Sequence, residues 1–108
     1  MKLVQITFQV QYTDQIGEIL RAIEPARWVT HSRVAGRDSD GRHEGSQAFP
    51  GSLALAQAVL PNDAVTGLLE ALRTFREEKR AHRHLQAVVL PVEDGIGTVD
   101  EDDDRGAQ

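Results

Sequence analysis

The residues of this chain best suited to bind a ligand gather in a polar segment between residues 35 and 51. Flexible backbone and positive charge alternate there, at Gly36, Arg37, Gly41, Arg42 and Gly45. Glycines let backbone amides approach a ligand closely, and guanidinium groups make charge-assisted hydrogen bonds to phosphate or carboxylate-like anions. The segment therefore predicts an anion-binding loop. The same composition is also typical of an exposed loop without a ligand, and the residues alone leave both interpretations open.

A second group of cations, Lys79, Arg80 and Arg83, lies near the end of the second predicted helix. Cations at a helix C-terminus offset the helix dipole, which is their commonest role. They are equally placed to contact a phosphate across a subunit boundary, although Glu77 and Glu78 dilute the positive field. We therefore include the three cations in the candidate anion site and keep the structural interpretation beside it.

The histidines and serines give only weak indications of metal binding or catalysis. His82 and His84 are two residues apart, but a bare His-x-His pair supplies too few of the three or four ligands that zinc needs. We assign no metal ligands and expect these histidines to lie on the surface. The serines belong to no nucleophile motif and have no partnered acid or base. We therefore predict no catalytic residues and no enzyme.

Composition narrows the class of protein. The 108 residues suffice for one domain with one core, and a net charge of -5 disfavours a nucleic-acid-binding surface. No apolar run approaches the roughly 20 residues of a membrane span, so we do not expect a membrane-embedded protein. We expect a cytoplasmic protein with one domain over residues 1–97 and an acidic, disordered tail over residues 98–108.

Hydrophobic periodicity outlines six elements. Residues 4 to 11 alternate with a period of two, which predicts a strand. A helix with one apolar stripe follows and stops at Pro25, and further strands are expected at about residues 28–34 and 53–60. Pro61 opens a second helix, and a last strand covers about residues 85–90. The order βαββαβ predicts an α+β, ferredoxin-like fold, with a four-stranded antiparallel sheet and two helices on one face.

The face of that sheet opposite the helices is either covered by another subunit or exposed to solvent. Each predicted helix has a single apolar stripe, so the two helices cover one face only. Ala54, Ala56 and Ala58 share a face of the third strand. Small side chains allow another layer to approach closely, so we expect this alanine face to contact another subunit. A solvated face is the alternative, since antiparallel sheets tolerate one.

Four segments resemble the PII signalling superfamily in order and spacing. Residues 30–37, Thr-His-Ser-Arg-Val-Ala-Gly-Arg, resemble its strand that leads into the loop. Residues 87–96, Ala-Val-Val-Leu-Pro-Val-Glu-Asp-Gly-Ile, resemble its closing strand, and residues 41–45, Gly-Arg-His-Glu-Gly, resemble the signature of its loop. Residues 61–63, Pro-Asn-Asp, resemble the start of its second helix. The likeness covers roughly residues 2 to 96. Residues 77–84 lack the glycines of the family's phosphate loop, and residues 95–98 replace its closing arginine pair. The chain therefore resembles a non-classical branch, of the carboxysome and inorganic-carbon type or the transporter-associated type.

This resemblance implies a function. PII-like proteins are trimers that bind nucleotides in the clefts between subunits. For this chain, the resemblance implies a homotrimeric regulator that binds an adenine nucleotide, AMP or ADP rather than ATP, with bicarbonate as a second anion. The 35–51 loop would then modulate a partner transporter, enzyme or carbon-uptake component. The alternative is a trimeric, divalent-metal-binding protein of the CutA type, which shares the fold.

Overall fold

The computed structural model describes residues 1–23, 27–34, 36–38, 41–43 and 52–97. In chain order the elements are β1 (Lys2–Gln9), η1 (Val10–Tyr12), α1 (Thr13–Arg21), β2 (Arg27–Val34), β3 (Gly36–Asp38), β4 (Gly41–His43), β5 (Leu53–Leu60), α2 (Asn62–Glu78), η2 (Arg80–His84) and β6 (Gln86–Pro91). The predicted βαββαβ order is confirmed. The structure adds to it the short strands β3 and β4, which pair within the segment that we expected to be a loop, and two 3-10 turns.

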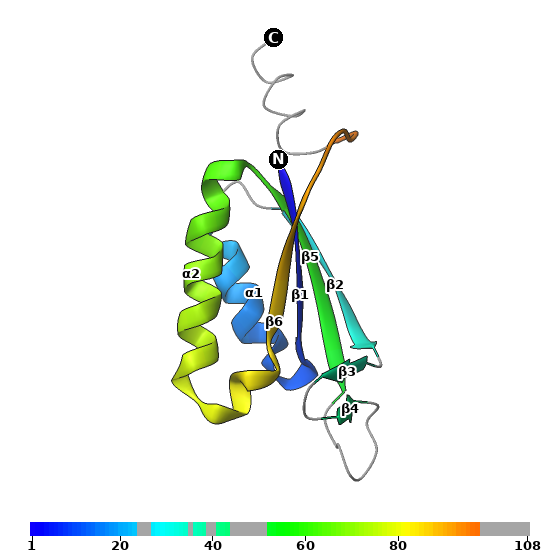
Figure 1. The fold of residues 1–108 in the computed structure, drawn as a ribbon, viewed down its shortest axis with the longest axis vertical. Coiled ribbons are helices and arrows are strands. Elements are labelled where there is room, and N and C mark those ends of the chain that lie inside the picture. The colour runs from blue at the N-terminus through cyan, green and yellow to red at the C-terminus, as the bar shows by residue number, and fades with distance from the viewer. Residues whose placement is uncertain (24–26, 35, 39–40, 44–51, 98–108) are drawn as a thin grey trace.

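The four long strands form one antiparallel sheet in the order β2-β5-β1-β6, so β2 and β6 are its edges. Figure 1 shows α1 and α2 side by side on one face of this sheet. Strand β1 ends sooner than its alternating pattern predicts. The Val10 amide donates to the Ser52 carbonyl at 2.8 Å, and residues 10–12 turn into η1 before the first helix.

The core lies between the helices and the sheet. Val4, Ile6 and Phe8 of β1 point into it and are at most 1% exposed. They meet two buried residues of each helix, Ile16 and Leu20 of α1 and Leu68 and Leu72 of α2. The alternation in the first strand and the stripes of the two helices are therefore complementary, as amphipathic elements require.

The expectation about the alanine face is wrong. Ala54, Ala56 and Ala58 are fully buried beneath the helices, because the pairing register sets them opposite Phe8, Ile6 and Val4. Their small side chains leave room for larger residues from β1 and the helices. The alanines therefore belong to the core of a single chain and carry no information about a subunit contact.

The uncovered face of the sheet carries the alternate residues of the same strands. In the centre, the Gln57 Nε2 donates to the Gln5 Oε1 at 3.2 Å. Apolar side chains surround this pair, and Val29 and Val88 on the two edge strands are 57% and 54% exposed. The face is thus a mixture of paired amides and exposed valines.

The expected acidic tail, residues 98–108, lies outside the described residues. Among the helices that the structure describes, none combines the length and the hydrophobicity needed to cross a membrane.

Candidate functional site

Strands β3 and β4 bring two predicted cations into register. Their pairing sets Gly36 opposite His43, Asp38 opposite Gly41, and Arg37 opposite Arg42. Like charges at directly opposed positions destabilise a β-ladder unless something neutralises them. Asp38 and Asp40, in the same segment of the sequence, carry two charges of the opposite sign. The sequence placed Arg37 and Arg42 in one loop, whereas the structure pairs their backbones. Gly45, the remaining glycine of the predicted loop, lies outside the described residues.

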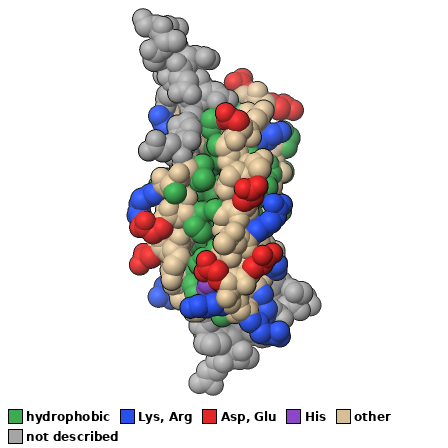
Figure 2. Space-filling model, turned by 90° about the vertical axis from the view of Figure 1, so that its left-hand side faces the viewer, with side chains coloured by type: hydrophobic (Ala, Val, Ile, Leu, Met, Phe, Trp, Pro, Cys, Tyr) green, Lys and Arg blue, Asp and Glu red, His purple; other side chains and the backbone are tan. Residues whose placement is uncertain are grey.

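The second cation group lies in and just before η2. Lys79, Arg80 and Arg83 are exposed. Figure 2 shows Lys and Arg side chains gathered at the corresponding lower end of the helical side, whereas charges of both signs are mixed above it. Arg76 fastens this turn to α2, since its Nε donates to the Leu85 carbonyl and its Nη2 to the Arg83 carbonyl, both at 2.9 Å. The basic segment is therefore held in a defined place.

A buried histidine holds the same turn from inside. The His82 ring stacks on Phe75 with a centroid distance of 3.9 Å and an interplanar angle of 4°, and Tyr12 meets it edge-on at 4.6 Å. The His82 Nδ1 donates to the Phe75 carbonyl at 2.6 Å. The expectation of surface histidines is wrong, because His82 is 5% and His84 8% exposed. A 3-10 turn in place of a strand directs the His82 ring beneath the end of α2.

The two cation groups lie at the same end of the sheet but at opposite edges. Strand β2 leads into β3 and β4, whereas η2 leads into β6 (Figure 1). Two strands, β5 and β1, separate these edges, which corresponds to roughly 14 Å at the usual strand spacing. Sheet order therefore keeps the two halves of the predicted site apart within one chain.

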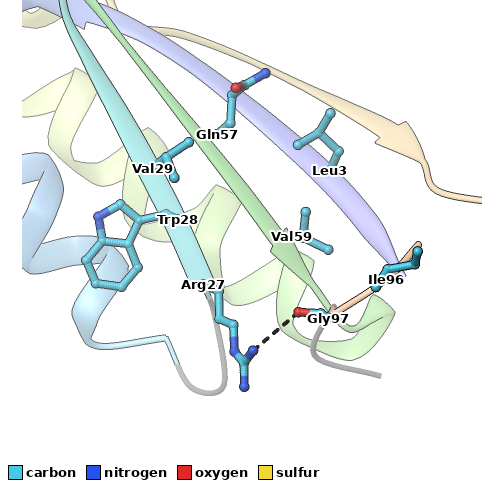
Figure 3. A pocket seen from close by; sticks show the side chains of 8 residues that line it. All are labelled: Leu3, Arg27, Trp28, Val29, Gln57, Val59, Ile96 and Gly97. Atoms are coloured by element: carbon cyan, nitrogen blue, oxygen red, sulfur yellow. Dashed lines mark hydrogen bonds between the residues drawn. The ribbon is translucent and has the colours of Figure 1, made fainter. Parts of the chain in front are cut away.

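A hollow that the sequence did not predict opens at the other end of the sheet. It has a volume of about 370 Å³, and its apolar wall includes Leu3, Val29 and Val59 from the uncovered face. Figure 3 shows the Arg27 guanidinium at its rim, where Nη1 donates to the Gly97 carbonyl at 3.3 Å. An apolar wall with few polar groups is typical of a ligand pocket. No predicted site residue lines it, and the scattered positions of its residues gave no motif.

Possible metal ligands are dispersed over the described ranges. No three His, Asp or Glu side chains gather there in an arrangement that could hold a metal ion. His82 is committed to a backbone carbonyl and two aromatic rings.

No protein-family model matches the chain. A search among curated proteins also finds no match. Solved structures do match. CPII, a nitrogen regulatory PII-like protein from Thiomonas intermedia K12 bound to ADP, AMP and bicarbonate, has a TM-score of 0.71 at 20% identity, over 87% of this chain and 93% of that one.

Two further structures extend the likeness. A PII-like signalling protein from Thermus thermophilus has a TM-score of 0.62 at 16% identity, over 84% of this chain and 85% of that one. A DUF3240 family protein from Shewanella baltica has a TM-score of 0.56 at 11% identity, over 88% and 93%. At these identities the likeness shows the fold. The chain has the fold of PII-like proteins, and the resemblance predicted from the sequence is confirmed at that level.

Proposed function

We propose that this chain is a PII-like regulatory protein that binds an adenine nucleotide between the subunits of a homotrimer. ADP or AMP is the nucleotide, bicarbonate is a second anion, and the 35–51 segment passes the signal to a partner transporter or enzyme. The observation that carries the proposal is the placement of two cation groups at opposite edges of one end of the sheet. The proposal involves no catalysis.

Assembly of copies into a ring brings the two cation groups of neighbouring chains together. In a closed ring of copies, the same two different surfaces of a chain meet at every interface. If the β2 edge of one copy meets the β6 edge of the next, the β3–β4 pair of the first faces η2 of the second. Arg37 and Arg42 of one chain and Lys79, Arg80 and Arg83 of its neighbour then surround one cleft. Gly36 and Gly41 let the backbone approach a ligand closely in the same cleft, and Gly45, outside the described residues, stays a prediction.

Electrostatics favour an anion in that cleft. The opposed positions of Arg37 and Arg42 set two cations on one two-stranded element, and Lys79, Arg80 and Arg83 of the neighbour add three more, whereas Asp38 and Asp40 carry the opposite charge in the first segment. Phosphate is a strong ligand for paired guanidinium groups. Because residues 77–84 contain no glycine for backbone amides to cradle a long phosphate chain, we favour the mono- and diphosphate over ATP.

The choice of ligand also draws on the structural neighbours. CPII structures from Thiomonas intermedia K12 contain ADP, AMP and bicarbonate. Signalling then follows from a population shift, which requires the nucleotide to bind one arrangement of the 35–51 segment better than another. A transporter or carbon-uptake component is the partner that the resemblance implies.

Calorimetric titration of AMP, ADP and ATP tests the proposal, with bicarbonate present and absent. We expect ADP or AMP to bind, and Arg42→Ala to weaken binding by about 1.5–3 kcal/mol, or roughly tenfold or more. Arg21→Ala is the matched control, since Arg21 is an exposed cation at the end of α1, outside the proposed cleft. Nucleotide binding that is absent near millimolar, or equal in wild type and Arg42→Ala, would contradict the assignment. Copper or zinc binding without nucleotide binding would favour the metal alternative.

A further inference from the structure

Strand β2 contains an irregularity just before β3. His31 pairs with Leu55 and Val34 with Leu53, so β2 advances three residues while β5 advances two. Ser32 and Arg33 therefore both lie opposite Ala54, which defines a β-bulge. Arg33 has a φ of 58°, and it is the one non-glycine residue with positive φ among those the structure describes.

The bulge has a clear structural effect. With regular pairing, Arg33 would stand opposite Leu53, whose side chain is only 6% exposed. The extra residue moves Val34 into that position, so an apolar side chain faces Leu53 instead of a guanidinium. Packing thus accounts for the bulge itself.

Packing does not account for an arginine in the left-handed conformation. A side chain with a Cβ is strained there, and glycine or asparagine is the usual occupant. Residues kept in such conformations concentrate at ligand-binding sites, and bulges at sheet edges re-aim side chains beside such sites. The positive φ of Arg33 is therefore an outlier, and its explanation must involve the Arg33 side chain.

The surroundings of Arg33 supply that reason. Its side chain is exposed, and it makes no hydrogen bond or ion pair with any residue in the described ranges. Arg76 and Arg21, by contrast, are engaged, since Arg76 donates to two carbonyls and Arg21 pairs with Glu18. Arg33 lies three residues before Gly36, on the edge strand that leads into the paired positions of Arg37 and Arg42.

We infer that Arg33 is a third anion-binding cation of the β3–β4 site, which the bulge releases from the sheet so that it can contact the phosphate of the bound nucleotide. The inference deepens the proposed function and rests on it for the identity of the nucleotide. The chemistry itself, a guanidinium that binds a phosphate, also applies to pyrophosphate without an adenosine.

The variant Arg33→Gly separates binding from folding. Glycine relieves the left-handed strain, so we expect a melting temperature equal to or above that of wild type. We expect ADP and pyrophosphate to bind about fivefold to tenfold more weakly, with a smaller loss of affinity as salt is added. Arg33→Lys keeps the charge and should retain most of the affinity. Arg21→Gln removes an exposed charge at the end of α1 and should change neither quantity.

The outcomes are distinct. If wild type binds ADP and Arg33→Gly binds it as tightly, the bulge serves packing alone and this inference is wrong, while the proposed function stands. If wild type binds pyrophosphate but no adenine nucleotide, and Arg33→Gly loses pyrophosphate, the inference stands and the nucleotide proposal fails. If wild type binds neither ligand up to about 10 mM, both are wrong.

Discussion

The two faces of the sheet arise from the same four strands, yet they serve different ends. Beneath the helices, Ile6 and Phe8 pack against small alanines and exclude water completely. On the opposite face, a Gln5–Gln57 hydrogen bond lies among half-buried and exposed apolar side chains. The first face forms the hydrophobic core of one chain. The second combines a paired amide with exposed valines, so alternate residues of each strand serve the core and the surface.

Deletion of a large side chain on the covered face should have the largest effect. Phe8→Ala removes a 1%-exposed ring from the centre of the core, and we expect it to lower the free energy of unfolding by about 3–5 kcal/mol. Thr7→Ala, one residue away on the uncovered face, is the control and should cost far less. Denaturant unfolding of both variants measures the difference. Equal losses would mean that the faces are not distinct.

A charge on the uncovered face should break assembly and leave the fold intact. Val88 lies on the uncovered face at the β6 edge, which the proposed ring joins to β2 of the next chain, and we expect Val88→Arg to place an unpaired guanidinium at that subunit contact. Light scattering should fall from about three times 11.9 kDa to a single chain, with an unchanged circular dichroism spectrum. Thr66→Arg adds the same charge to an exposed position of α2 and should stay trimeric. A wild type that is already monomeric would remove the intersubunit cleft.

Enlarging an alanine tests which face it occupies. Ala56 is fully buried beneath the helices, and we expect Ala56→Leu to cost about 1–3 kcal/mol through overpacking. The particle mass of the folded protein should not change. Ala22→Leu, at an exposed position after α1, is the control. If Ala56→Leu instead kept its unfolding free energy and lost only its trimer mass, the alanines would lie at a subunit contact after all.

The sequence predicted the fold well wherever polar and apolar residues alternate. Residues 4 to 9 and the stripes of the two helices identified their elements because one side of each is polar. In β5, leucines and alanines alternate with almost no polar residue, so nothing in its pattern says which side faces the helices. Pairing with β1 decides that, and the alanine face was therefore misassigned.

The sequence predicted which residue types form the candidate site, but it did not predict how those residues are arranged in space. Glycines and arginines indicated an anion-binding segment, but polar residues gave no sign that β3 and β4 would pair. The His-x-His spacing has the period of a strand, whereas a 3-10 turn directs His82 into an aromatic stack. The separation of the two cation groups depends on sheet order, which the order of elements along the chain does not determine.

A complementation experiment with mixed trimers tests the central claim most directly. One chain carries Arg42→Ala, and the other carries Lys79→Ala with Arg80→Ala, so each lacks one half of the proposed cleft. Each variant alone should bind ADP weakly. In trimers assembled at random from equal amounts of both, about one quarter of the clefts should combine two intact halves and bind ADP with wild-type affinity. A site within one chain would restore none, and calorimetry showing no tight binding in the mixed trimers would contradict the account.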